Sequence, residues 1–446
     1  MHYRNAPIHP VLRIMYHFFK LVSRVFIGIF FREKILIGKE NLRFDGPAII
    51  VVNHPSTLMD VLTSGIHIHQ EMYFLANYSL FKNPVGNWFF STFYCIPVKR
   101  KEDMGDSVVR NNSAAFISSF EHMEKNGVLY IAAEGVSWIN RFVRPFKTGA
   151  ARIAFGTENR NDWKKDLKII PIGLSYSAAH LFRSRVVVEA GVPISPLTWK
   201  DACLNDHEKA VDGFTLQMEN AVRNLCIDTR DEAGEALFNA LEIIAAGSAP
   251  LKPKDDYLRS KKIAQTCLQD ATLKKFSEEY FSEIGERKIT DAGLLAHAHP
   301  RATLHAWRNG LFLLFGLPMF LAGQIFWFLP CFLPWLLNRQ LKLYIGYSST
   351  VKVMTGLLTF PLAAWGVFKL AFWVVGHTGY ALLILAALVL SGFFLEKYLD
   401  VYKRFTEQRR AAQNVPDTLE LLSKRTVIWH KLEQMIREAD KVKEVH

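Results

Sequence analysis

The sequence predicts an α/β fold followed by helices in a membrane. Between residues 34 and 194, short apolar runs typical of strands alternate with helical stretches, a pattern that favours a largely parallel or mixed sheet flanked by helices. Long apolar runs follow between Asn309 and Leu395, and some of them are long enough to cross a bilayer. The net charge of +12 over 446 residues favours an anionic membrane surface over nucleic acid as the partner.

The first element is an amphipathic helix within residues 1–33. Val11–Arg32 is strongly apolar, but Arg13, His17, Lys20 and Arg24 form one polar stripe at helical spacing. Charges inside a spanning helix are costly, so we expect an in-plane interfacial helix with this stripe at the headgroups. The alternative is an amphipathic helix packed on the domain. A secretory signal is not expected, because basic residues interrupt the apolar region.

Residues 34–200 are predicted to form one α/β domain. Helices are expected at Ser107–Lys125 and Thr148–Thr157. The predicted strands are apolar and bounded by turn residues; they are Lys34–Gly38, Ala48–Asn53, Met72–Asn77, Tyr94–Val98, Val128–Ala132, Lys168–Leu174 and Val186–Glu189.

The strand Pro47–Val52 leads directly into a possible acid–base pair. His54 follows the strand, Pro55 and Ser56 suit the start of a helix, and Asp60 falls in the first turns of that helix. The two side chains can meet if His54 lies on the turn and Asp60 reaches back. They would then form a general base with its orienting carboxylate. The alternative is a capping turn with a surface His and an unrelated Asp.

Two further strand ends carry polar residues. Lys99, Arg100 and Lys101 follow one predicted strand, and basic side chains there can bind phosphate; a solvated loop is the alternative. Glu134 and Gly135 follow another strand. Glycine permits close approach of the backbone to a ligand, so this pair is a candidate binding site. The alternative is a turn with a structural Glu.

Taken together, these stretches resemble the glycerolipid acyltransferase superfamily, whose members acylate glycerol-3-phosphate and lysophosphatidate. The family's first block is usually N-H-x-x-x-x-D. Five residues separate His54 from Asp60, which is similar to the eukaryotic-type membrane-bound glycerol-3-phosphate acyltransferases. The second block, I-P-V-x-R, matches Ile96–Val98 and Arg100.

The third and fourth blocks extend the resemblance. The E-G pair matches Glu134 and Gly135, and P-F-K-x-G matches Pro145–Gly149. The fourth block, V-P-V-G, resembles Ile170–Gly173, and Phe182–Gly191 is close to the F-R-S-R-x-x-V-E-x-G segment of the glycerol-3-phosphate branch.

The resemblance implies a layered acyltransferase domain and a role for each matched residue. His54 would be the general base and Asp60 its partner, with Arg100 binding the acceptor phosphate. The other substrate-binding residues implied are Glu134, Gly135, Ser137, Lys147 and Pro171. Ser137 stands where the family consensus has Arg, so Arg141 and Arg144 are candidates to replace that residue.

The implied chemistry is direct acyl transfer. The co-substrate would be an acyl thioester of coenzyme A or acyl carrier protein, with no bound cofactor or metal. Backbone N–H groups near Gly135 or at the start of the helix after His54 could hold the oxyanion.

Residues 201–306 are predicted to be a helical subdomain without a catalytic constellation. Residues 307–396 are predicted to lie in the membrane. Asn309–Trp335, which contains three prolines, is expected to be a re-entrant or broken helix. Val353–Val375 and Tyr380–Leu395 are expected to cross and return, leaving residues 397–446 as a cytoplasmic helical tail. The competing topology has three crossings and the tail outside.

We therefore expect an integral membrane protein with its catalytic domain on the cytoplasmic face. Its expected function is acylation of glycerol-3-phosphate in phospholipid biosynthesis. Lysophosphatidate is the alternative acceptor. A non-catalytic membrane scaffold with an acyltransferase fold is the alternative from another class, and a metal-dependent hydrolase that uses His54 and Asp60 as ligands is a weaker one.

Overall fold

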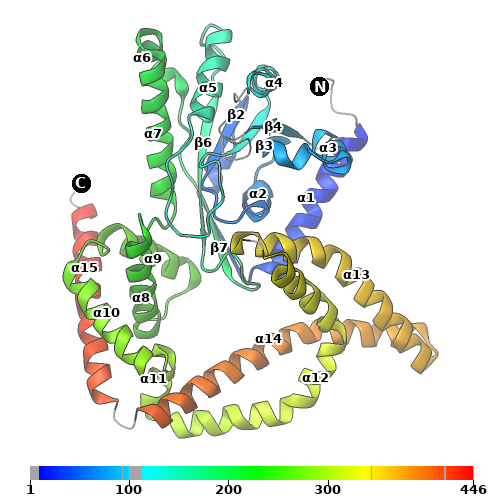
Figure 1. Cartoon of the computed structure of the whole chain (residues 1–446), viewed down its shortest axis with the longest axis vertical. Coiled ribbons are helices and arrows are strands. Elements are labelled where there is room, and N and C mark those ends of the chain that lie inside the picture. The colour runs from blue at the N-terminus through cyan, green and yellow to red at the C-terminus, as the bar shows by residue number, and fades with distance from the viewer. Residues whose placement is uncertain (1–9, 93, 100–111, 343, 416–417, 445–446) are drawn as a thin grey trace. The chain divides into compact units, whose positions relative to one another are not determined.

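The computed structural model describes residues 10–92, 94–99, 112–342, 344–415 and 418–444. The chain divides into two compact units (Figure 1). Unit 1 comprises residues 1–230 and 345–349, and unit 2 comprises residues 231–344 and 350–446.

Unit 1 is built on a mixed seven-stranded sheet of order β1-β7-β6-β2-β5-β3-β4. Only β6 and β7 pair antiparallel, and the other neighbours pair parallel. This confirms the predicted α/β class with its mixed sheet. The strands are β1 (Glu33–Ile37), β2 (Ala48–Val52), β3 (Met72–Asn77), β4 (Cys95–Val98), β5 (Val128–Ala132), β6 (Lys168–Tyr176) and β7 (Arg185–Ala190).

Helices cover the sheet. Those after the N-terminal helix are α2 (Leu58–Gly65), α3 (Pro84–Thr92), α4 (Ser113–Glu124), α5 (Gly149–Arg160), α6 (Lys200–Asn205) and α7 (His207–Leu225). α4, α5 and α7 share one buried cluster with Ile49 and Val51 of β2. The predicted domain boundary at residue 200 is therefore wrong. α7 buries Phe214 and Met218 against the sheet, so the unit extends to Arg230.

The register of β2 fixes where its carboxyl end lies. Val52 pairs with Ala132 of β5 and with Ile172 of β6. One residue later, the Asn53 amide extends the pairing, because Nδ2 donates to Leu174 O (2.9 Å) and Oδ1 accepts from Leu174 N (2.8 Å). The carboxyl ends of three parallel strands therefore meet beside His54, which is where open α/β sheets commonly bind ligands.

The N-terminal helix α1 (Pro10–Phe30) presents its polar stripe to the protein. Arg13 pairs with Glu71 (2.7 Å), Arg24 donates to Ile66 O (3.1 Å), and Lys20 Nζ donates to Ile68 O. A carboxylate and two backbone carbonyls of unit 1 thus bind three residues of the stripe, while the Arg13 and His17 side chains remain 63% and 55% exposed. The interfacial location of the helix stays a prediction. The residues left exposed are apolar: Val11, Ile14, Phe18, Leu21, Val25 and Ile29.

Unit 2 contains the helices α8 (Glu232–Ser248), α9 (Pro253–Thr266), α10 (Ala271–Glu286), α11 (Asp291–Ala298) and α15 (Leu419–Glu444). A buried ion pair joins the last of them to the others. Arg425 Nε lies 2.7 Å from Asp291 Oδ1, and both side chains are almost fully buried. Tyr280 and Ser248 add hydrogen bonds to the two partners. The C-terminal helix is thus an integral part of this bundle.

Among the described residues, three helices are long and apolar enough to cross a membrane. They are α12 (Ala302–Leu341), α13 (Ser348–Val375) and α14 (Thr378–Asn414). The expected break at the prolines is wrong, because α12 continues through Pro318, Pro330 and Pro334 and only changes direction along its length (Figure 1). A proline removes one hydrogen bond and kinks a helix. α14 continues past the predicted end of the membrane region at residue 396 and runs to Asn414, so the last apolar segment and the start of the predicted helical tail form one helix.

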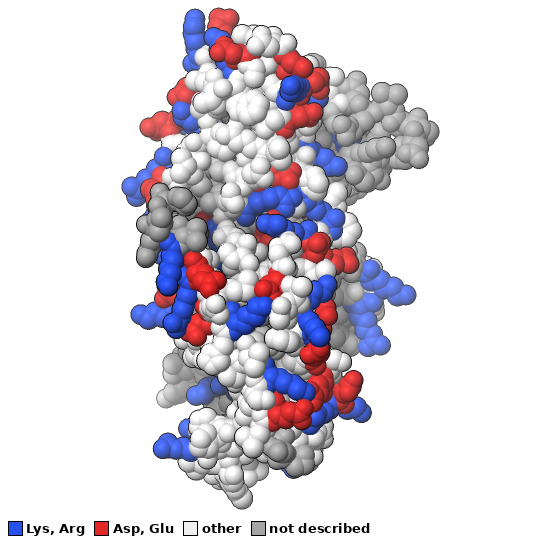
Figure 2. All heavy atoms as spheres, turned by 90° about the vertical axis from the view of Figure 1, so that its left-hand side faces the viewer, with Lys and Arg blue, Asp and Glu red and all other residues white. Residues whose placement is uncertain are grey.

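Charged residues are unevenly distributed. Basic and acidic side chains are intermixed over the face that Figure 2 shows, as on surfaces that face water. By contrast, α13 carries only Lys352 and Lys369 among its 28 residues. The apolar helices are therefore suited to lipid and the charged face to water.

Candidate active site

A histidine–aspartate pair lies at the carboxyl end of β2. His54 Nδ1 lies 2.8 Å from Asp60 Oδ2, so the predicted contact is confirmed. The helix begins later than predicted, at Leu58, with Thr57 before it in a left-handed conformation (φ 47°). This strained turn brings Asp60 back toward the strand end, and strain of this kind is common at functional sites.

Asp60 is held by three donors. Besides His54, Oδ2 accepts from Ser56 N (2.8 Å), and Oδ1 accepts from Tyr176 Oη (2.8 Å). Only 1% of the Asp60 side chain is exposed. Burial, followed by the charge of Asp60, raises the pKa of Tyr176 well above its ordinary value, so the phenol keeps its proton and remains a donor. These contacts fix the carboxylate in one orientation.

Sequence reasoning missed Tyr176. The residue ends β6, two positions beyond the predicted strand. The sequence feature that could have indicated Tyr176 is its position at the end of an apolar strand, in the block that resembles the family's V-P-V-G strand.

The geometry selects one tautomer of His54. A carboxylate only accepts hydrogen bonds, so Nδ1 carries the proton and Nε2 has the lone pair. Within the described part of the chain, no residue bonds to Nε2. The side chain is 20% exposed. The ring can therefore accept a proton from a bound hydroxyl.

Glu134 supports the turn that carries His54. Its Oε1 accepts from His54 N (2.9 Å), and the Arg144 backbone N–H also donates to the carboxylate. Burial, opposed by these hydrogen bonds, raises the pKa of Glu134 to about 7. These contacts are those of a structural Glu in a turn, the predicted alternative to substrate binding.

The loop after β5 is tied to the turn after β2. Ser137 Oγ accepts from Thr57 N (3.1 Å), and Trp138 N donates to His54 O (3.1 Å). Gly135 has φ +77°, which favours glycine, and a Cβ there would meet the Lys147 side chain at 3.4 Å. Glu134, Gly135, Ser137 and Lys147 therefore gather around the His54 turn.

The predicted oxyanion donors are already engaged. Gly135 N donates to Ala132 O, Ser56 N to Asp60 and Thr57 N to Ser137. In this structure these three N–H groups stabilise the loops that carry the pair.

Two predicted substrate-binding residues do not join this group. Pro171 is buried within β6, opposite Val51, and packs beside Gly191 rather than at the strand end. Arg100 lies outside the described residues. The strand before it, β4, ends at Val98 and lies three places from β2 in the sheet, or about 14 Å at the usual strand spacing.

Arg144 lies close to the pair through its loop. Its guanidinium carbon is 4.2 Å from the Trp138 ring centre and 5.0 Å from that of Phe142. Its Nε is buried and has no hydrogen-bond partner among the described residues. A planar cation with an unused donor suits a phosphate.

Residues 35–175, about a third of the chain, match the family model described as Acyltransferase. Glycerol-3-phosphate O-acyltransferase 1 of Saccharomyces cerevisiae is 37% identical over 84 residues, which cover 19% of this chain and 11% of that protein. Glycerol-3-phosphate O-acyltransferase 2 of the same yeast is 36% identical over a segment covering the same shares. The matched segment thus spans about a tenth of these relatives.

Among solved structures, the 1-acyl-sn-glycerophosphate (LPA) acyltransferase from Thermotoga maritima aligns with part of the chain. It aligns with a TM-score of 0.33 and 17% identity, covering 47% of this chain and 81% of that one.

Proposed function

We propose that this protein is a membrane-bound O-acyltransferase that moves a fatty acyl group from a thioester to the hydroxyl of glycerol-3-phosphate in phospholipid biosynthesis. The observation that carries the proposal is the His54–Asp60 pair at the carboxyl end of β2, inside the segment that matches the acyltransferase family model.

The reaction would proceed by direct transfer. His54 Nε2 takes the proton of the acceptor hydroxyl while its oxygen attacks the thioester carbonyl. The tetrahedral intermediate then expels the thiolate, which receives the proton from the imidazolium. One ester bond forms as one thioester bond breaks, and His54 returns to its neutral form. Asp60 stabilises the imidazolium between the two steps.

Glycerol-3-phosphate is the proposed acceptor for two reasons. The five-residue gap in the first block and the Phe182–Gly191 segment resemble the glycerol-3-phosphate branch. The two yeast relatives are also named for that acceptor.

The test is an assay of the purified full chain with both acceptors and an acyl-coenzyme A donor, with products identified by mass spectrometry. We expect the product of glycerol-3-phosphate acylation, and a loss of about 10²–10⁴ in rate for His54→Ala. Near-normal turnover of that variant would contradict the mechanism. Acylation of lysophosphatidate alone would overturn the acceptor while leaving the class of enzyme intact. The complete absence of transfer to either would favour the scaffold.

We further propose that Arg144 binds the acceptor phosphate together with Arg100, since Arg144 is one of the two candidates to replace the consensus arginine at the position of Ser137. Its buried, unpaired Nε supports this choice. Arg144→Gln should raise the KM for the phosphorylated acceptor by roughly tenfold or more and leave the KM for the donor unchanged. Arg141→Gln removes the same charge nearby and is the matched control. Equal effects of both variants on both substrates would exclude a specific phosphate contact.

The proposed location of the catalytic domain is the cytoplasmic face of a membrane. α12, α13 and α14 supply apolar helices of sufficient length. The segment 338–352 carries Arg339, Lys342 and Lys352, whereas the segment 376–379 carries no Lys or Arg. The tail after Leu395 is also rich in Lys and Arg, and this distribution supports the orientation.

A further inference from the structure

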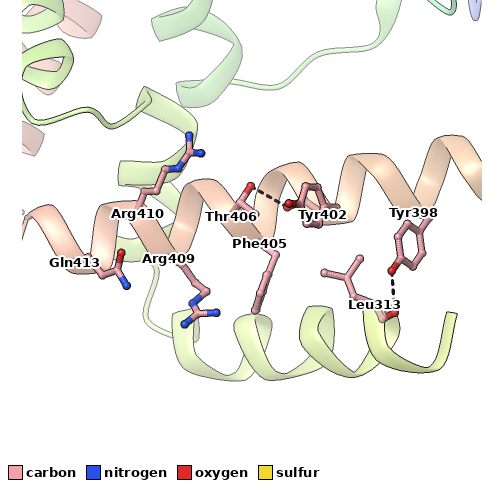
Figure 3. Close-up of a pocket in the computed structure, with 8 residues that line it drawn as sticks. All are labelled: Leu313, Tyr398, Tyr402, Phe405, Thr406, Arg409, Arg410 and Gln413. Carbon is pink, nitrogen blue, oxygen red and sulfur yellow. Dashed lines mark hydrogen bonds between the residues drawn. The ribbon is translucent and has the colours of Figure 1, made fainter. Parts of the chain in front are cut away.

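Unit 2 contains a cavity between α12 and α14. Its volume is about 450 Å³. The lining residues come from one position of α12 and seven of α14: Leu313, Tyr398, Tyr402, Phe405, Thr406, Arg409, Arg410 and Gln413 (Figure 3). A volume of this size can hold a polar headgroup with the start of an acyl chain.

The α14 side of the cavity has a consistent chemical character. Tyr398, Tyr402, Phe405, Arg409 and Gln413 recur at intervals of three or four residues, so they share one helix face. No lining residue is acidic. Arg409 and Gln413 point toward the α12 side of α14, whereas Arg410 points away from it (Figure 3). The cavity therefore has aromatic walls and a positive charge.

Arg409 is available to a ligand. Its guanidinium lies 5.6 Å from the ring centre of Phe405, and the residue is exposed. Among the described residues it forms no ion pair with a carboxylate. An arginine held over an aromatic ring keeps its planar donors directed outward, which suits phosphate oxygens.

The cavity lies where both helices change from apolar to polar. The apolar run of α14 ends at Leu395, and the next turn carries Tyr398, whose Oη donates to Leu313 O (3.0 Å). Gly310, at the start of the apolar part of α12, lies opposite Phe405. Tyr398 also stacks on Phe320, with ring centres 4.5 Å apart, so aromatic rings close the apolar end. Aromatic residues at such a transition are typical of a membrane interface.

We propose that this cavity binds the phosphate headgroup of an anionic phospholipid. Arg409 binds the phosphate, Gln413 adds a hydrogen-bond donor, and Leu313 with Tyr398 contacts the first part of the acyl chain. Basic pockets between membrane helices at the interface commonly bind such headgroups. The assignment does not depend on the proposed reaction.

The test uses the purified full chain in detergent and native mass spectrometry of bound lipid. The probes are phosphatidylglycerol and phosphatidylcholine with identical acyl chains. We expect the anionic lipid to be retained preferentially. Arg409→Gln should weaken its binding at least about tenfold, which corresponds to about 1.4 kcal/mol, and Arg409→Lys should retain part of it. The matched control is Arg404→Gln, which removes an exposed charge from another face of the same helix.

Three results would overturn the proposal. Equal loss in the Arg409→Gln and Arg404→Gln variants would indicate general charge attraction. Unchanged binding in Arg409→Gln would exclude the cavity. Displacement of the lipid by an equal concentration of inorganic phosphate would assign the site to free phosphate instead. Thermal unfolding of each variant checks that the fold is retained.

Discussion

Glu134 is a buried carboxyl group whose ionisation destabilises the folded state. Its pKa is raised from 4.5 to about 7 by burial, so the folded state favours the protonated form. The stability that the protonated Glu134 carboxyl provides, relative to its ionised form, is therefore fully present below about pH 4.5. It is lost as pH rises through about 7. The shift corresponds to about 3 kcal/mol at most.

We expect Glu134→Gln to remove most of this pH dependence. The amide oxygen can still accept from His54 N, but the side chain no longer ionises. The apparent melting temperature of the wild-type protein should fall between pH 5 and pH 8 relative to that of the variant. Glu40→Gln, at an exposed position, is the control and should follow the wild type. Parallel pH profiles for wild type and Glu134→Gln would contradict the interpretation.

The pairing of His54 with Asp60 could be predicted because both residues are close in sequence and one strand end limits where they can lie. Tyr176 could not be predicted in the same way. It is 116 residues from Asp60, and only the sheet order brings β6 beside β2. Arg144 was one of two equal candidates until its packing on Trp138 distinguished it from Arg141.

The strands were predicted well because most are uninterrupted apolar runs, whose burial on both faces of a sheet leaves little choice of structure. The helices were harder. The polar stripe of α1 can be satisfied by headgroups or by protein, and the helical pattern is the same in both cases. In the structure Glu71 and the carbonyls of Ile66 and Ile68 bind it.

The ends of the long helices were the least predictable elements. Proline was expected to break α12, but the helix continues past all three prolines over 40 residues, because a proline can kink a helix without ending it. The start of the charged region was taken as the end of the last membrane segment. α14 continues because Gln408 Nε2 donates to the Ala296 and Ala302 carbonyls, which holds its polar half against α11 and α12.

Two tertiary contacts constrain any arrangement of α12, α13 and α14 in a membrane. Asp291 precedes α12 and Arg425 follows α14, yet they form a buried ion pair and must lie on the same side. Ser349, between α12 and α13, bonds to Ser56 at 2.9 Å. The candidate spans among the described helices are α12, α13 and α14. No described helix between Ser56 and Asp291 therefore qualifies as a span. We therefore infer that α12 begins and ends on one side and that α13 and α14 cross and return.

This topology can be tested by cysteine labelling. In a background that lacks the exposed Cys331, single cysteines are placed at Thr378, the first residue of α14, and at Glu420 in α15. An impermeant reagent added from the non-cytoplasmic side of sealed vesicles of known orientation should modify the first and spare the second. Modification of residue 420 from that side would require three crossings.

The bond between Ser56 and Ser349 also has a consequence for biosynthesis. The two hydroxyls are 293 residues apart in the chain, and Ser56 N is one of the donors to Asp60. During synthesis, every strand of the sheet and all of α12 therefore leave the ribosome before Ser349, the partner of the Ser56 hydroxyl, emerges. A nascent chain released at residue 344 would contain both catalytic candidates and still leave a buried serine without its bond. The order of synthesis thus makes the Ser56–Ser349 bond a late event, after the first long apolar helix has already left the ribosome.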